Sequence, residues 1–138
     1  TTDTAEVIIR QYDAQLCGKR GIFLVQYTLA VDRGNANISY LYNHFNPAVL
    51  RLVQRTISSA RENGIWAGMC GEMASDPNAA VLLMAMGISE LSMSAPSIPR
   101  VKEKIRSISS VKAKEILADV MAMEDGDDIR NYLQKILG

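Results

Sequence analysis

The sequence predicts an α/β fold in which short parallel strands alternate with helices. Three segments of strand length are the apolar runs at residues 21–25 and 65–70 and the segment at residues 90–94. Segments with the apolar spacing of amphipathic helices separate them, and the clearest begins at Pro47 and ends before Gly64. Strands that alternate with helices of this length are typical of βαβ units, whose strands pair in parallel.

The elements before Pro47 follow from one helix-start signal and one apolar run. A capping-box pattern at residues 3–6 predicts a helix over Thr4–Cys17. Residues 21–25, Gly-Ile-Phe-Leu-Val, have the length and composition of a strand that is buried on both faces. We expect a short helix at residues 26–31 and a loop at 32–35.

The elements after Pro47 are delimited by prolines and glycines. Pro47 opens a helix, and Asp76-Pro77 opens another because a capping side chain precedes a proline at the first helical position. Gly64 and Gly87 close these two helices. The expected order is a helix at 47–63, a strand at 65–70, a helix at 77–86, a strand at 90–94, and helices at 99–106, 111–123 and 129–137.

Composition excludes several classes of function. Apolar residues make up 48% of the 138 residues, and the 15 Lys and Arg balance the 15 Asp and Glu. A balanced charge gives no electrostatic attraction for nucleic acid or for an anionic membrane surface, so we expect neither partner. No apolar stretch reaches membrane-spanning length. Cys17 and Cys70 are the two cysteines, and we expect both to be reduced, which fits a cytoplasmic protein.

Three segments with polar tips point to one shared site. Cys70 ends the apolar run at 65–70 and is followed by Gly71 and Glu72. The other two tips are residues 26–35 and residues 90–100. Because α/β enzymes place their chemistry at the carboxyl ends of strands, we expect these tips to meet there.

The same segments carry a resemblance to a known family. From about residue 24 to residue 138 the chain resembles the C-terminal part of enzyme I of the bacterial phosphotransferase system, the phosphoenolpyruvate-protein phosphotransferases. The matching stretches are Gln26–Asn35, Leu41-Tyr42, Asn46–Leu50, Gly68–Ala74 and Glu90–Arg100. Nothing in residues 1–23 matches the family pattern, so we divide the chain into an unmatched segment, 1–23, and a portion of the phosphoenolpyruvate-binding barrel domain, 24–138.

The resemblance implies a fold and an activity. The fold would be a partial TIM (β/α)8 barrel, consisting of its last three βα units and an N-terminal helix of unknown origin. The activity would be transfer of a phosphoryl group from phosphoenolpyruvate to a protein histidine, the step that starts the sugar phosphotransferase relay. The family motifs assign the catalytic proton donor to the enolate to Cys70 and the contact with the phosphoryl group to Arg33. Further implied partners are a homodimer mate, a histidine-bearing N-terminal domain and a carrier protein.

One departure from the family pattern concerns the cofactor. The family has Gly-Thr-Asn-Asp where this chain has residues 20–23, Arg-Gly-Ile-Phe, and the family Asp binds Mg²⁺. Ile and Phe have no oxygen ligand to offer, which puts a magnesium site in this chain in doubt. His44, the single histidine, has no second ligand or catalytic partner nearby in sequence, and we expect a packing or surface role for it.

Two functions remain open at this point. The chain is either a part of a phosphoenolpyruvate-dependent phosphotransferase that is incomplete alone, or a non-catalytic assembly or dimerisation module, including a rearranged piece of the parent protein. The first hypothesis uses Arg33 and Cys70, whereas the second rests on the break in the family pattern at Leu24.

Overall fold

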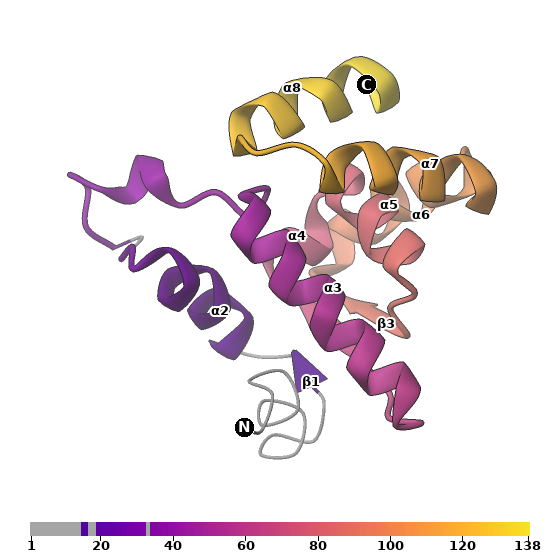
Figure 1. The fold of residues 1–138 in the computed structure, drawn as a ribbon, viewed down its shortest axis with the longest axis horizontal. Coiled ribbons are helices and arrows are strands. Elements are labelled where there is room, and N and C mark those ends of the chain that lie inside the picture. The colour runs from indigo at the N-terminus through magenta and orange to yellow at the C-terminus, as the bar shows by residue number, and fades with distance from the viewer. Residues whose placement is uncertain (1–14, 17–18, 33) are drawn as a thin grey trace.

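The computed structural model describes residues 15–16, 19–32 and 34–138 (Figure 1). Three short strands and a set of helices form one α/β unit in this part of the chain. The elements are β1 (Gln15–Leu16), α2 (Lys19–Leu29), η1 (Ser39–Leu41), α3 (Pro47–Glu62), β2 (Gly68–Cys70), α4 (Glu72–Ser75), α5 (Pro77–Met86), β3 (Glu90–Ser92), η2 (Ala95–Ser97), α6 (Ile98–Arg106), α7 (Ser110–Met121) and α8 (Gly126–Leu137). None of the helices described here is long and apolar enough to cross a bilayer.

The sheet is parallel and its strands follow one another in chain order, β1-β2-β3. Gln15 pairs with Gly68 on one side of β2, and Cys70 pairs with Ser92 of β3 on the other side. Helices α2 and α3 connect the first two strands, while α4 and α5 connect the second pair. The predicted α/β class with parallel strands is therefore confirmed, and β2 is the central strand.

Two predictions for the first 25 residues were wrong. Residues 21–25 belong to helix α2 and not to a strand, and Gln15–Leu16 form β1 where the end of a helix was expected. The rest of the helix predicted over Thr4–Cys17 lies outside the described residues. A short apolar run does not distinguish a buried strand from a helix segment by periodicity alone. Here Val25 is buried while Tyr27 is 81% exposed, which is the one-sided burial of a helix.

The other strands are present but shorter than expected. Strand β2 covers only the last part of the predicted run 65–70, because Ile65 and Trp66 are partly exposed and precede the sheet. Strand β3 stops at Ser92, and the 3-10 turn η2 follows soon after. The helices predicted after Pro47 are confirmed to within a few residues at each end, with the predicted break between α7 and α8.

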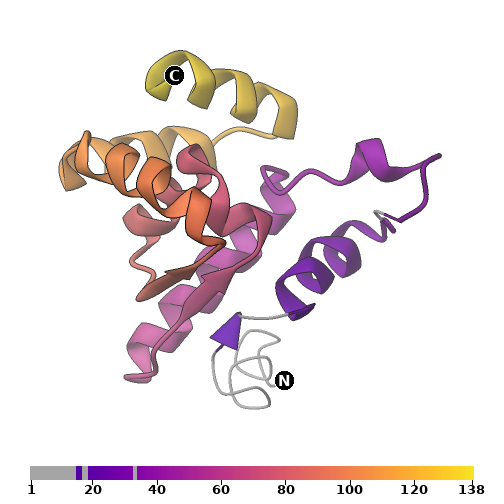
Figure 2. The ribbon, with the colours of Figure 1, turned by 180° about the vertical axis from the view of Figure 1, so that it is seen from behind.

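Helix α5 is the centre of the core. It contacts α3, α4, α6, α7 and α8, and Figures 1 and 2 show it enclosed by these helices. Its residues 79–83 are all fully buried, so the helix has no solvated face, as expected for a helix that lies in the core. The ends of α5 follow the sequence signals. The Asp76 side chain accepts hydrogen bonds from the backbone N–H groups of Asn78 (2.8 Å) and Ala79 (3.1 Å), and Gly87 closes the helix at φ 91°.

Truncation of Leu82 tests this arrangement. Leu82 is fully buried in the central cluster, so Leu82→Ala removes buried apolar surface and leaves a cavity. We expect the free energy of unfolding in urea to fall by about 2–5 kcal/mol. The matched control is Val111→Ala on α7, whose side chain is 67% exposed and whose truncation should change stability by about 0.5 kcal/mol or less. Equal losses in the two variants would contradict the placement of α5 in the core.

Candidate functional site

Cys70 lies at the carboxyl end of the central strand. It is the last residue of β2 and is partly exposed. The next residue, Gly71, has φ 83°, a conformation that L side chains rarely adopt, and the chain then turns into α4 at Glu72. A glycine at this position thus allows the sharp turn that leaves the thiol at the edge of the sheet. This is the edge where ligands bind in open parallel sheets.

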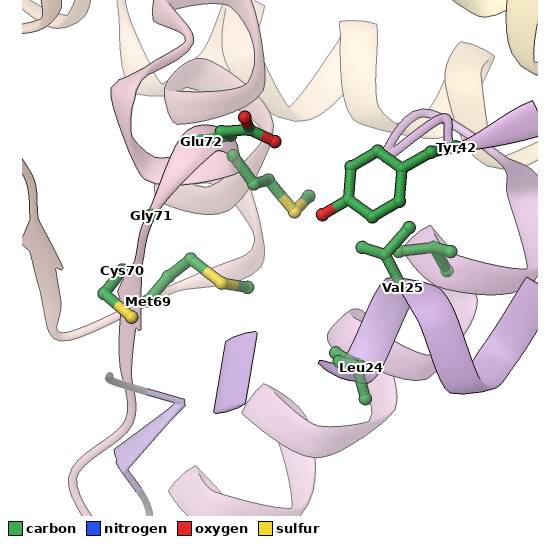
Figure 3. A pocket seen from close by; sticks show the side chains of 9 residues that line it. Leu24, Val25, Tyr42, Met69, Cys70, Gly71 and Glu72 are labelled. Atoms are coloured by element: carbon green, nitrogen blue, oxygen red, sulfur yellow. The ribbon is translucent and has the colours of Figure 1, made fainter. Parts of the chain in front are cut away.

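A pocket opens beside Cys70. The space between its lining residues is about 330 Å³ when open solvent is included, so it is a shallow hollow and not an enclosed cavity. The lining residues come from α2, the η1–α3 connection, α3, β2 and α4, and they are Leu24, Val25, Tyr42, Val49, Met69, Cys70, Gly71, Glu72 and Met73. Figure 3 shows Tyr42 with its hydroxyl pointing into the pocket, while Met69, Cys70 and Glu72 lie on the opposite side.

Among the described residues of the lining, the polar side chains are a thiol, a phenol and a carboxylate. The thiol of Cys70 can donate a proton or act as a nucleophile. Glu72 is exposed at the pocket's edge. Among the described residues that line the pocket, none is Lys or Arg. An anionic ligand would therefore need a cation from another part of the chain or from a partner.

Arg33, the predicted phosphoryl contact, lies outside the described residues. Its neighbours form a tight turn after α2, in which the Asp32 side chain accepts a hydrogen bond from the Gly34 N–H at 2.8 Å. The third predicted tip is not part of the pocket lining, although Ser92 pairs with Cys70 across the sheet. The structure brings Cys70 together with Tyr42, which sequence reasoning did not select. The signal available for Tyr42 was its place in the matching stretch Leu41-Tyr42.

His44 packs next to this pocket and not within its lining. Its side chain is 17% exposed, and its ring lies against Phe45 with a centroid distance of 4.4 Å. Its Nε2 is 3.4 Å from Oδ2 of Asp76, the cap of α5. Burial raises the pKa of Asp76, but the interactions with His44 and the N–H groups of Ala79 and Asn78 together outweigh it and hold the pKa below its usual value of 3.8.

The described residues do not fit a magnesium site. Within residues 15–16, 19–32 and 34–138, no group of three or more His, Cys, Asp or Glu side chains could hold a metal ion. Magnesium requires several oxygen ligands in near-octahedral geometry, and Glu72 is the one carboxylate among the pocket-lining residues named above. We therefore assign no step of any reaction to a metal in this chain.

Comparisons with known proteins identify a domain family and a set of relatives. Residues 6–110 match the model of the family described as PEP-utilising enzyme, PEP-binding domain. The chain is 44% identical over 133 residues to the phosphoenolpyruvate-protein phosphotransferase of Buchnera aphidicola subsp. Acyrthosiphon pisum, which covers 96% of the chain and 23% of the relative. It is 53% identical over 96 residues to that of Haemophilus influenzae, covering 70% of the chain and 16% of the relative.

A third relative is the phosphoenolpyruvate-protein phosphotransferase of Priestia megaterium, 42% identical over 111 residues, which are 80% of the chain and 19% of the relative. The chain thus spans less than a quarter of the length of these relatives. The family match begins at residue 6, inside the segment 1–23 that the sequence analysis set apart.

Asp76→Asn tests the pKa of the cap. Asn keeps a capping oxygen but loses the charge beside His44, so we expect the free energy of unfolding to fall by about 1 kcal/mol at pH 7. Because the folded-state pKa is lowered, the charge stabilises the fold above pH 3.8, and this contribution is lost as the pH falls further. Urea unfolding of both proteins from pH 7 to pH 2.5 measures it. A difference between the two that grows on acidification would contradict the pKa direction.

Proposed function

This chain belongs to the family of PEP-utilising enzymes through their PEP-binding domain, and on that premise we propose that it supplies phosphoenolpyruvate binding to a phosphotransferase. The relatives are named phosphoenolpyruvate-protein phosphotransferases. The observation that carries the proposal is the thiol of Cys70 at the carboxyl end of the central strand, on the wall of a largely apolar pocket. Cys70 is the described residue of this pocket that we propose as the donor of a proton to the enolate left after phosphoryl transfer.

Cys70 is proposed as the proton donor to carbon. When the phosphoryl group leaves phosphoenolpyruvate for a histidine on another domain, the P–O bond breaks and its electron pair remains as an enolate. The enolate's methylene carbon then takes the proton from the thiol of Cys70, which yields pyruvate and a thiolate. Water returns a proton to the thiolate. A thiol suits this role because it is a moderately weak acid that the strand end holds in a fixed place.

Arg33 is proposed as the contact with the phosphoryl group. The pocket lining among the described residues has no cation, and the charge of a phosphate requires one. A guanidinium presents a planar set of donors that matches two phosphate oxygens at once. Arg33 is four residues beyond the end of α2 in the sequence, and α2 is the helix that provides Leu24 and Val25 to the pocket.

The architecture proposed for this site is the last part of a (β/α)8 barrel. Three consecutive parallel strands with helical crossovers, and chemistry at their carboxyl ends, support this assignment. Strands β1 and β3 would leave open edges outside a closed barrel, which favours association, and we propose a homodimer. The boundary at residue 24 stays a prediction, to be weighed against a family match that begins at residue 6.

The second candidate is a non-catalytic assembly or dimerisation module. The absence of Lys and Arg from the described pocket lining, and of a metal-holding group from the described residues, favours it. The first candidate includes three further proposals. The protein is cytoplasmic, and its partners are a histidine-bearing domain and a carrier protein. Direct binding of phosphoenolpyruvate separates the two candidates.

Calorimetric titration of phosphoenolpyruvate into the purified chain tests the first candidate. We expect binding by the wild type, and a rise in Kd of about 10- to 100-fold in Arg33→Ala, since a hydrogen-bonded charge pair is lost. Parallel titrations with and without Mg²⁺ show whether binding depends on the metal. The matched control is Arg106→Ala at the exposed end of α6. Absence of heat in every titration would reject the first candidate and favour the assembly module.

Cys70→Ala tests the proton transfer. We expect the variant to fold with nearly unchanged stability and to lose the chain-dependent exchange of pyruvate methyl protons with deuterated water, measured by proton NMR. Val111→Ala is the control, because this side chain is 67% exposed on α7 and outside the pocket lining, and it should exchange like the wild type. Exchange at the wild-type rate in Cys70→Ala would exclude this thiol as the donor.

A further inference from the structure

The connection between η1 and α3, residues 42–46, is anchored to several elements at once. Tyr42 lines the pocket. Phe45 is 3% exposed and belongs to the central apolar cluster. Asn46 caps α3, because its side chain accepts a hydrogen bond from the Ala48 N–H at 2.9 Å. The residue that carries the pocket's phenol therefore belongs to a short segment that contacts both the core and the start of α3.

The side of this segment next to α8 is closely packed. The Asn43 amide donates a hydrogen bond to Oδ1 of Asp127 at 3.3 Å, and its own oxygen accepts one from the Phe45 N–H at 3.0 Å. Gly126, the first residue of α8, lies so close that a Cβ there would come within 2.7 Å of the Asn43 amide nitrogen. These contacts attach the segment to α8. The contacts that relate it to the Cys70 wall are on its opposite side, next to the corner between α4 and α5.

On that other side, His44 contacts the corner between α4 and α5. The two oxygens of Asp76 have different partners. Oδ1 caps α5 through the N–H groups of Asn78 and Ala79, while Oδ2 lies 3.4 Å from Nε2 of His44. The Nε2 atom is buried, and its contact with Asp76 is an ion-pair distance that does not meet hydrogen-bond geometry; no other described residue offers it a hydrogen bond. Asp76 directly follows α4, and α4 directly follows the Cys70-Gly71 turn.

We propose that His44 is a positioning residue for the pocket: through Asp76 it holds the Tyr42 segment against the α4–α5 corner and so sets the distance between the Tyr42 and Cys70 walls. This inference rests on the proposed binding of phosphoenolpyruvate in that pocket. The two walls come from segments far apart in sequence, and Figure 3 shows them facing each other. A small ligand needs both walls at the right separation, because contacts with it weaken steeply over an ångström.

Two substitutions remove the contact between His44 and Asp76 without removing the cap of α5. His44→Ala removes the imidazole. Asp76→Ser keeps a side-chain acceptor for the start of α5, since Ser caps helices about as well as Asp, but Ser is too short to reach His44. We expect each to raise the Kd for phosphoenolpyruvate by roughly three- to tenfold, and the double variant to bind no more weakly than the weaker single variant.

Rescue and control variants separate positioning from general destabilisation. His44→Gln keeps a side-chain N–H donor within reach of Asp76, so its Kd should lie within about twofold of the wild-type value. Lys112→Ala removes another ion pair, Lys112–Glu115 at 2.9 Å on α7, which has no residue in the pocket lining, and it should leave the Kd unchanged. Thermal unfolding of every variant is recorded beside the calorimetric titrations.

The outcomes are distinct. Weaker binding in both single variants, no further loss in the double variant and recovery in His44→Gln would support the positioning role. If the wild type binds phosphoenolpyruvate and the single variants bind equally well, or if their losses add in the double variant, the inference falls while the proposed function stands. If the wild type itself does not bind phosphoenolpyruvate, the proposed function and this inference fall together.

Discussion

Burial of helix α5 on all sides is the constraint on which the rest of the structure depends. A helix without a solvated face requires neighbours around its whole circumference, and α3, α4, α6, α7 and α8 fill these places. Its start is fixed by the Asp76 cap, so the corner between α4 and α5 is fixed as well. The turn at Gly71 and the end of β2 are directly joined to that corner. The position of Cys70 thus follows from the packing of a helix that never touches the pocket.

The pocket is built from segments that the core places side by side. Strand β2 and α4 supply the thiol and the carboxylate, whereas α2 and the η1–α3 connection supply apolar walls and the phenol of Tyr42. This arrangement suits proton transfer to a carbon atom, because a thiol is held at a strand end beside apolar walls. It does not by itself suit capture of a phosphate, since its described lining contains no cation. The proposed function therefore depends on Arg33 or on residues of a partner to provide charge.

The sequence predicted those features whose signals are local. The helix start at Pro47, the cap at Asp76 and the closing glycine Gly87 have chemical signatures within a few residues, and the helices that they bound were confirmed. The strand predicted at 21–25 was wrong because a short apolar run fits both a helix and a buried strand. The contact of His44 with Asp76 was beyond sequence reasoning, since it joins residues 32 positions apart through the packing of two helices. Tyr42 was missed because only the folded chain places it across the pocket from Cys70.

If phosphoenolpyruvate occupies the pocket against Cys70, it must cover the thiol, and alkylation of the native chain by iodoacetamide tests this most directly. Mass spectrometry of the Cys70 peptide reports the rate at that residue. We predict that saturating phosphoenolpyruvate slows alkylation of Cys70 by about tenfold or more, as expected for a thiol covered by a bound ligand. An unchanged rate at Cys70 would contradict this prediction.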